Sequence, residues 1–158
     1  MRIYWPTITP ASEIGTSNMK AVLMYGANDI RYEEIPRPAC PEGGLILKTM
    51  AVGLCGSDIR DLTTDSRPGN YPFIGGHEFT GIVDEVCPTQ TEYKVGDRLY
   101  AYPGDHCLRC EYCRIGRHEL CWRPTKYKER QGCFAEYVPI AAPQLSVASI
   151  FRIPDGVS

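Results

Sequence analysis

The feature that most constrains this chain is a group of four cysteines within fifteen residues. Cys107, Cys110, Cys113 and Cys121 follow the spacing C-x2-C-x2-C-x7-C. Each C-x-x-C step lets two sulfur atoms turn back onto one ion, and the seven-residue return closes a tetrahedron. Four thiolates fill the coordination shell of a Zn2+ ion and leave no open position. The spacing therefore predicts a structural zinc site.

The segment around these cysteines, residues 107–124, is polar and has too few apolar residues to fold by packing alone. Metal binding supplies on the order of 10 kcal/mol of folding free energy to such elements. An iron–sulfur site competes with this interpretation, but the common bacterial pattern ends in C-x3-C-P, and here the fourth cysteine comes four residues later. Two disulfides are the other competitor, and the lack of an apolar secretory signal disfavours them. Zinc is the stronger prediction.

Length and charge limit what the rest of the chain can do. A chain of 158 residues builds one domain with a core, but it cannot also hold a full nucleotide-binding fold. The formal net charge of −2 argues against a nucleic-acid binder, which would carry a basic face. No run of 18 apolar residues occurs, so we expect no membrane span. Without a secretory signal, the expected location is the cytoplasm.

Short β-like runs separated by glycine and proline predict a mostly β domain. Only one short helix is expected, over residues 57–63, with Ser57 as its N-cap. Residues 1–18 show no clear period and predict an extension before an organised part that begins at Met19. Many short strands with little helix are typical of a barrel or a sandwich. The expected strands are residues 20–25, 29–35, 45–54, 79–86, 98–102 and 134–140.

A second set of metal-binding side chains lies upstream, in two segments 22 residues apart. Cys55 precedes Ser57 and Asp58, and His77 is followed by Glu78. A thiolate, an imidazole and a carboxylate, each near glycines, form the mixed ligand set expected of a catalytic zinc with an exchangeable position. Asp58 would hold the imidazole of His77 and fix its tautomer. Taken singly, the same types are packed cysteines, ordinary histidines and solvated carboxylates, so spacing alone leaves both interpretations open.

Several motifs together resemble the zinc-dependent medium-chain dehydrogenases. The resemblance covers residues 19–158, and it is strongest to the polyol (sorbitol-type), sugar and threonine dehydrogenases. The elements that carry it, in the family's order, are Cys55-Gly-Ser-Asp, Gly-His77-Glu78, Val95-Gly96-Asp97-Arg98, the four-cysteine lobe and Gly132-Cys133-Phe134-Ala135-Glu136-Tyr137-Val138.

The resemblance implies a fold and two zinc sites. The fold is a GroES-like catalytic domain over residues 19–158, a partly open β-barrel with short helices and the zinc lobe at 107–124. Ser57 would pass the alcohol's proton towards solvent, and Asp58 would support the site. The structural zinc would lie on Cys107, Cys110, Cys113 and Cys121, and the catalytic zinc on Cys55, His77 and Glu78, with Glu78 either a ligand or close beside the ligands.

The implied reaction is oxidation of a small alcohol, polyol or sugar. Zinc would act as a Lewis acid on the substrate oxygen while hydride passes to NAD or NADP bound by a Rossmann domain. No two glycines of this chain are separated by a single residue, so even G-x-G is absent. We therefore expect the Rossmann domain to be missing and the chain alone to be inactive, with oligomers possible in the full-length enzyme.

Departures from the family pattern keep a second function in view. Arg60 stands where many alcohol dehydrogenases have a relay histidine, and Cys87 stands where the family usually has glycine. Cys87, Cys40 and Cys133 are interpreted as small packed residues. The alternative function is a stand-alone zinc-stabilised binding module without dehydrogenase activity. In that case Cys55 and His77 would be relics.

Overall fold

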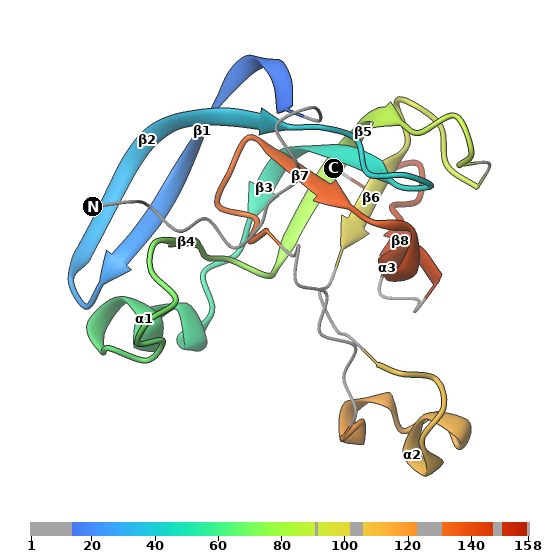
Figure 1. Cartoon of the computed structure of the whole chain (residues 1–158). Coiled ribbons are helices and arrows are strands. Elements are labelled where there is room, and N and C mark those ends of the chain that lie inside the picture. The colour runs from blue at the N-terminus through green and yellow to red at the C-terminus, as the bar shows by residue number, and fades with distance from the viewer. Residues whose placement is uncertain (1–13, 91, 102–105, 123–130, 147–149, 158) are drawn as a thin grey trace.

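The computed structural model describes residues 14–90, 92–101, 106–122, 131–146 and 150–157, and strands dominate this part of the chain (Figure 1). The strands are β1 (Ile14–Gly26), β2 (Asp29–Pro38), β3 (Leu45–Val52), β4 (Phe73–Ile74), β5 (Phe79–Val86), β6 (Arg98–Ala101), β7 (Tyr137–Ile140) and β8 (Ile150–Arg152). The helices are short: α1 (Gly56–Thr63), α2 (Glu111–Arg114), the 3-10 helix η2 (His118–Leu120) and α3 (Ala142–Ser146). The predicted mostly β fold is confirmed.

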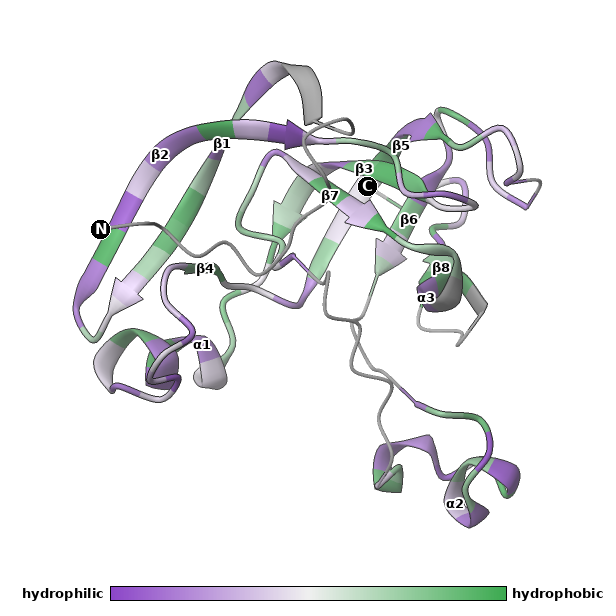
Figure 2. Cartoon of the chain, viewed as in Figure 1, coloured by the Kyte–Doolittle hydropathy of each residue, from purple (hydrophilic) through white to green (hydrophobic). Residues whose placement is uncertain are grey.

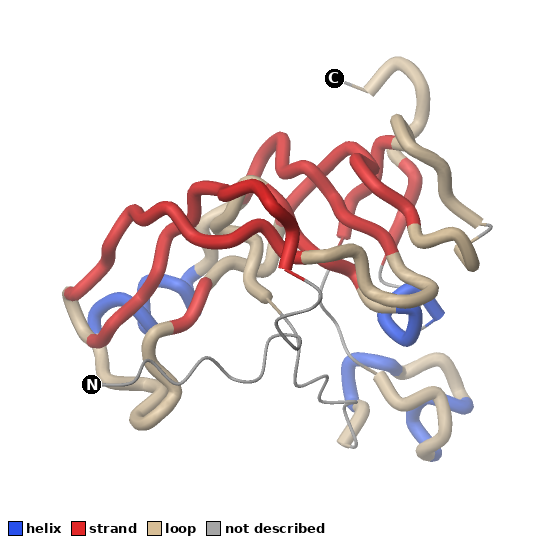
Figure 3. Tube along the Cα trace, turned by 45° about the horizontal axis from the view of Figure 1, so that its top comes forward, coloured by secondary structure: helices blue, strands red, loops and turns tan. Residues whose placement is uncertain are grey.

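Two antiparallel sheets form the body of the molecule. One has the strand order β2-β1-β4, and the other has the order β7-β3-β5-β6-β8. Figure 3 shows the two sheets side by side, with α1 beside the smaller sheet and α3 beside the larger one. Every strand pair in the described part of the chain is antiparallel, and a two-residue turn at 27–28 connects β1 to β2.

A short segment before β7 joins the two sheets. Ala135 forms an isolated bridge with Ala21 of β1. The amide of Val22 donates to the carbonyl of Phe134 at 2.8 Å, and the amide of Thr49 in β3 donates to the carbonyl of Glu136 at 2.9 Å. Residues 134–136 therefore contact both sheets at once, and β7 begins only at Tyr137, three residues later than predicted.

The main core lies against the five-stranded sheet. Its side chains come from alternate positions of neighbouring strands, as the half-buried strand pattern requires, and hydrophobic residues gather along β3 and β5 (Figure 2). A smaller cluster packs between β1 and the joining segment, with Leu23 fully buried. Burying each such leucine contributes about 1.5–3 kcal/mol. The core thus fixes the strand ends from which the candidate site residues project. Its buried members include Leu45, Leu47, Phe79, Val83, Leu99 and Val138.

Further local expectations differ from the structure. Only one short helix was expected, whereas the described residues also form α2, η2 and α3. β1 begins at Ile14, five residues before Met19, because its backbone continues to pair with β2 as far as Pro38. The N-cap of α1 is Cys55 rather than Ser57, because Cys55 is the last residue with extended backbone angles (φ −90°, ψ 157°). Residues 1–13 and the predicted lobe residues 123–124 lie outside the described residues. Among the described helices, none combines the length and the apolar character needed to cross a membrane.

Candidate metal centres

The four-cysteine lobe stands apart from the two sheets (Figures 1 and 3). Cys110 is the N-cap of α2 and Cys113 lies within it, while Cys121 directly follows η2. The Sγ atoms of all four cysteines lie within 4.8 Å of one another. Those of Cys107 and Cys113 are 3.9 Å apart, close to the spacing of about 3.8 Å that tetrahedral zinc with 2.3 Å bonds imposes. The donor set fits zinc.

Backbone amides prepare these sulfur atoms for a metal. The amides of Arg109 and Cys110 donate to Cys107 Sγ at 3.4 and 3.3 Å. Mainly because of the Arg109 amide, the pKa of the Cys107 thiol falls to about 6. Burial raises the pKa of Cys113 to about 12, so this thiol needs a cation to ionise near neutral pH. The four lobe cysteines are free thiols, so their sulfur atoms are available to a metal.

The described part of the lobe has little buried apolar surface. Among the described residues 106–122, only Cys110 and Cys113 are buried. The side chain of Ile115 is 72% exposed, so it contributes little packing. His106, directly before the first cysteine, and His118, between Cys113 and Cys121, stack on each other with ring centroids 4.4 Å apart. We therefore expect metal binding to make the main contribution to the folding of the lobe.

A second candidate centre lies where α1 meets the turn between β4 and β5. One ligand atom from each of Cys55, His77 and Glu78 lies within 4.8 Å of the other two. Strand pairing brings the two segments together, because β3 leads to Cys55 and its partner β5 follows Glu78. The amide of Gly53 donates to the carbonyl of Glu78 at 2.7 Å and extends this pairing to the site itself.

Two glycines make this approach possible. A Cβ atom on Gly53 would lie 2.8 Å from Glu78 Oε2 and 3.3 Å from Glu78 Cβ, so the Glu78 side chain would have to move. Gly76 has a φ of +86°, and a Cβ atom there would lie 2.7 Å from Cys133 Sγ. Glycine is the residue that tolerates both the left-handed backbone and the close contact. The glycines beside the predicted ligands therefore serve the geometry of the site.

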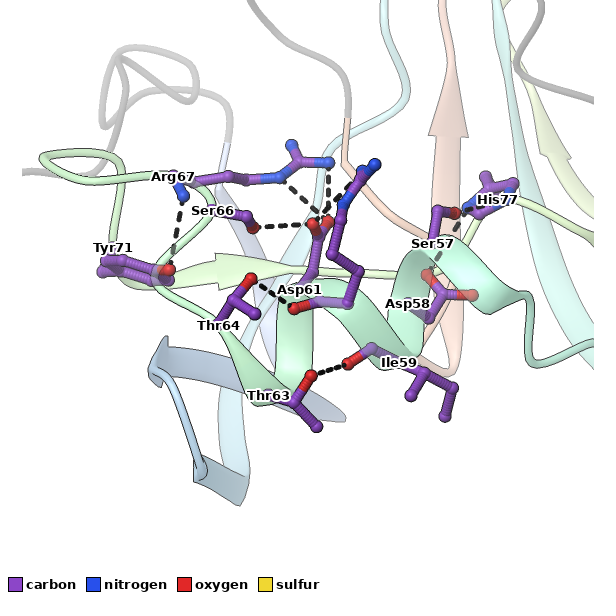
Figure 4. A network of polar contacts seen from close by, with 11 residues as sticks. Ser57, Asp58, Ile59, Asp61, Thr63, Thr64, Ser66, Arg67, Tyr71 and His77 are labelled. Carbon is purple, nitrogen blue, oxygen red and sulfur yellow. Dashed lines mark hydrogen bonds and ion pairs between the residues drawn. The ribbon is translucent and has the colours of Figure 1, made fainter.

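Asp58 and Ser57 contact the two nitrogen atoms of the His77 ring (Figure 4). Asp58 is buried; its Oδ2 accepts the amide of Cys55 at 2.9 Å, and its Oδ1 lies 3.4 Å from His77 Nδ1. Ser57 Oγ lies 3.4 Å from His77 Nε2, and Glu78 Oε1 lies 4.0 Å from the same atom. A proton on Nδ1, held by Asp58, leaves the Nε2 lone pair available to a metal. The set of a thiol, an imidazole and a carboxylate fits a zinc ion with an exchangeable position.

The sequence interpretation missed a buried carboxylate in the same helix. Asp61 is 4% exposed and contacts Ser66, Arg67 and Arg60. Arg60, which stands at the relay-histidine position, thus has its guanidinium 3.6 Å from Asp61. The available signal was an acidic residue on a short helix, with one arginine a single position earlier and another six positions later.

Comparison with known proteins agrees with this geometry. The sequence pattern of the alcohol dehydrogenase GroES-like domain matches residues 41–154. Sorbitol dehydrogenase of Bacillus subtilis (strain 168) is 37% identical over 147 residues, which are 89% of this chain and 40% of that protein. This chain therefore spans about two-fifths of the length of that relative.

Solved structures show the same relationship. An alcohol dehydrogenase (rspB) from Escherichia coli CFT073, complexed with NADH, is 29% identical with a TM-score of 0.72; the match covers 90% of this chain and 40% of that one. A protein assigned as a zinc-binding dehydrogenase from Sinorhizobium meliloti 1021, bound to NADP, is 33% identical with a TM-score of 0.71 over the same shares. The predicted resemblance and the GroES-like fold are confirmed. This chain belongs to the alcohol dehydrogenase GroES-like domain family, and its relatives are zinc-binding, sorbitol and alcohol dehydrogenases.

Proposed function

We propose that this chain is the zinc-binding catalytic domain of an NAD(P)-dependent alcohol or polyol dehydrogenase. The observation that carries the proposal is the meeting of Cys55, His77 and Glu78 within 4.8 Å, with the buried Asp58 beside His77 Nδ1. A mixed set of this kind leaves a coordination position for substrate, whereas the four cysteines of the lobe would fill all four positions of a zinc ion. A zinc ion bound at the mixed set supplies Lewis acidity to an alcohol or carbonyl oxygen.

The chain's own residues would orient the site and move one proton. Asp58 contacts His77 at Nδ1, which would leave Nε2 free to bind a metal. Cys55 and His77 are the proposed protein ligands, and Glu78 is a ligand or a close neighbour of them. The Ser57 hydroxyl, 3.4 Å from His77 Nε2 and half-buried, is placed to carry the substrate's proton towards solvent.

The cofactor and the substrate class rest on the relatives. NADH and NADP are bound by the two related structures, so a nicotinamide is the proposed hydride acceptor, held by a Rossmann domain outside these 158 residues. The sorbitol dehydrogenase relative favours a polyol as substrate. We propose the cytoplasm as the location, because eight free cysteines are suited to a reducing compartment.

Elemental analysis tests this proposal directly. Protein purified without added metal or chelator should contain about two zinc ions per chain, one at each centre. In Cys55→Ser the content should fall to about one, while the folded sheets remain, because Cys55 lies outside the core clusters. A wild-type content of one, unchanged by Cys55→Ser, would instead favour the stand-alone zinc-stabilised binding module.

Activity provides the second test. The 158-residue chain alone should show no NAD- or NADP-dependent oxidation of sorbitol, because no glycine pair in it has the G-x-G spacing of a dinucleotide site. Turnover by the pure chain would contradict the assignment of the nicotinamide to another domain. The zinc content of the same preparation shows whether an inactive sample holds its metals.

A further inference from the structure

A cluster of polar contacts holds the segment between α1 and β4, and the proposed function makes no use of it (Figure 4). At its centre is Asp61, whose side chain is 6% exposed. Oδ1 of Asp61 accepts a hydrogen bond from the Ser66 hydroxyl at 2.7 Å. Its Oδ2 accepts Nε–H of Arg67 at 3.1 Å and lies 2.9 Å from a second guanidinium nitrogen of Arg67. The carboxylate therefore binds two separate residues of this segment, Ser66 and Arg67.

Arg67 extends this contact to the strand that precedes His77. Its guanidinium carbon lies 4.6 Å from the ring centroid of Phe73, the first residue of β4. The backbone amide of Arg67 also donates to the hydroxyl of Tyr71 at 3.4 Å. We call the set Asp61, Ser66, Arg67 and Phe73 the Asp61–Arg67 clamp. The clamp links α1 to β4 by side-chain contacts rather than by strand pairing.

The two ends of the clamp lead to the two halves of the proposed metal site. α1 has Cys55 at its N-cap and Asp58 in its first turn, six and three residues before Asp61. β4 ends three residues before His77. We propose that Asp61 and Arg67 are positioning residues, which hold Cys55 and His77 at the separation that a metal requires. This inference rests on the proposed function, because it concerns the same metal site.

The clamp pairs a negative carboxylate, Asp61, with a positive guanidinium, Arg67. Burial alone would raise the pKa of Asp61. The Ser66 hydroxyl and the Arg67 guanidinium lower it by more than burial raises it, so the net shift of this pKa is downward. Asp61 is therefore ionised at neutral pH and needs its cation. Arg60 is a weaker partner, 65% exposed and 3.6 Å away. Removing Arg67 leaves a largely buried carboxylate with one exposed cation, Arg60, and the 64–72 segment keeps only Ser66 of its two contacts with Asp61.

The elements on either side of the clamp, α1 and β4, should stay folded when the clamp is removed. β4 pairs with β1 through Leu23–Ile74 and Met24–Phe73, and these backbone contacts do not involve Arg67. The amide of Asn28 donates to the carbonyl of Leu62 at 2.7 Å and fixes the end of α1 to the β1–β2 turn. A variant without Arg67 is therefore expected to fold, with the change concentrated in how Cys55 and His77 face each other.

Cobalt binding tests the clamp apart from activity. The cysteine lobe is kept filled with zinc, the exchangeable metal is removed by dialysis, and Co2+ is titrated into the second site in competition with a chelator. We expect Arg67→Ala to weaken cobalt binding by up to about tenfold, the lower end of the range for groups that contact a ligand directly, because Arg67 acts on the ligands through α1 and β4. Arg67→Lys keeps the charge but loses the two-pronged contact, so it should recover part of the affinity.

Arg31→Ala is a matched control. Arg31 also contacts an aspartate with two nitrogens, at 2.9 and 2.8 Å from Asp29, and lies 4.0 Å from the ring centroid of Tyr25. These side-chain contacts are of the same kind, but they join only residues of β1 and β2 and do not reach α1 or β4. Cobalt affinity in Arg31→Ala should equal that of the wild type, while the zinc content of the lobe stays at one in every variant.

The outcomes separate the clamp from the proposed function. Cobalt affinity unchanged in Arg67→Ala overturns the positioning role and leaves the metal site standing, even if the melting temperature falls. Failure of the wild-type protein to take up cobalt overturns the proposed function itself. Asp61→Asn should weaken binding in the same direction; should it not fold, Arg67→Ala still decides, because the Arg67 side chain is 52% exposed and its removal opens no core cavity.

Discussion

Oδ1 of Asp58 lies 3.4 Å from Nδ1 of His77, although His77 comes nineteen residues later in the chain. The other oxygen of the same carboxylate accepts the amide of Cys55 at 2.9 Å. One buried side chain thus touches both segments of the candidate catalytic centre. Such an arrangement fixes the imidazole ring before any metal arrives, which reduces the ordering that metal binding must supply.

Removal of Asp58 should weaken the mixed metal site selectively. In Asp58→Ala, the His77 ring loses its Nδ1 partner and the Cys55 amide loses its acceptor, so affinity for Zn2+ or Co2+ should fall by about 10- to 100-fold. Chelator competition measures this affinity. Asp65→Ala serves as the control, because Asp65 is exposed and lies beyond the end of α1. Equal affinity in Asp58→Ala and the wild type would contradict the support that we assign to Asp58.

Loss of one lobe cysteine should release one zinc and unfold the lobe alone. Cys107→Ser removes the sulfur that accepts two backbone amides, and the remaining lobe residues have too little buried surface to stay ordered. Zinc content should fall from about two to about one, and limited proteolysis should cut within residues 106–122. Cys87→Ser should leave both results unchanged. A protease-resistant lobe without zinc would refute the structural role of the metal.

Two glycines with left-handed backbone should differ in their tolerance of alanine. Gly76→Ala places a Cβ atom 2.7 Å from Cys133 Sγ, so strain and overpacking together should lower the free energy of unfolding by about 3 kcal/mol. Gly96→Ala, at a φ of +93° with nothing within 4 Å, should lose only about 1 kcal/mol. Urea denaturation measures both values. Equal losses would mean that the contact with Cys133 relaxes freely.

The two half-exposed cysteines near the β2–β3 turn should react at different rates. Burial raises the pKa of Cys40 to about 11, while a hydrogen bond with the Thr89 hydroxyl, 3.5 Å away, lowers the pKa of Cys87. A lower pKa gives more thiolate at a given pH, so iodoacetamide at pH 8 should label Cys87 at least about tenfold faster than Cys40.

Thr89→Val provides the control for this difference. Without the hydroxyl, the pKa of Cys87 should rise and its labelling should slow, with Cys40 unaffected. Peptide mass spectrometry of zinc-loaded protein distinguishes the two sites. Faster labelling of Cys40 than of Cys87 in the wild type would contradict the prediction.

The sequence was sufficient for the features that depend on local pattern. The spacing of Cys107, Cys110, Cys113 and Cys121 predicts a set of sulfur atoms that the structure brings within 4.8 Å. Alternating apolar residues predict β5 at its observed bounds, Phe79–Val86. Both follow from periodicities of a few residues, which a single sequence displays directly.

Features that depend on tertiary contacts were not predictable in the same way. β4 is two residues long and exists because β1 lies beside it, so its own sequence has no strand period. The early start of β1 reflects pairing with β2 rather than any pattern in residues 14–18. The contact of Arg67 with both Asp61 and Phe73 depends on how the 64–72 segment turns back, which neighbouring residues do not reveal.

The joining segment, residues 134–136, and Cys133 directly before it also set the order in which the domain can be completed during synthesis. The amides of Cys133 and Phe134 donate to the carbonyls of Gly76 and Gly75, directly before His77. A nascent chain that has emerged only as far as the cysteine lobe contains every proposed ligand but lacks the backbone partners of the His77 turn. Because such long-range pairing forms slowly, we expect the lobe to acquire its metal first, and the mixed site to mature only after residue 134 has left the ribosome.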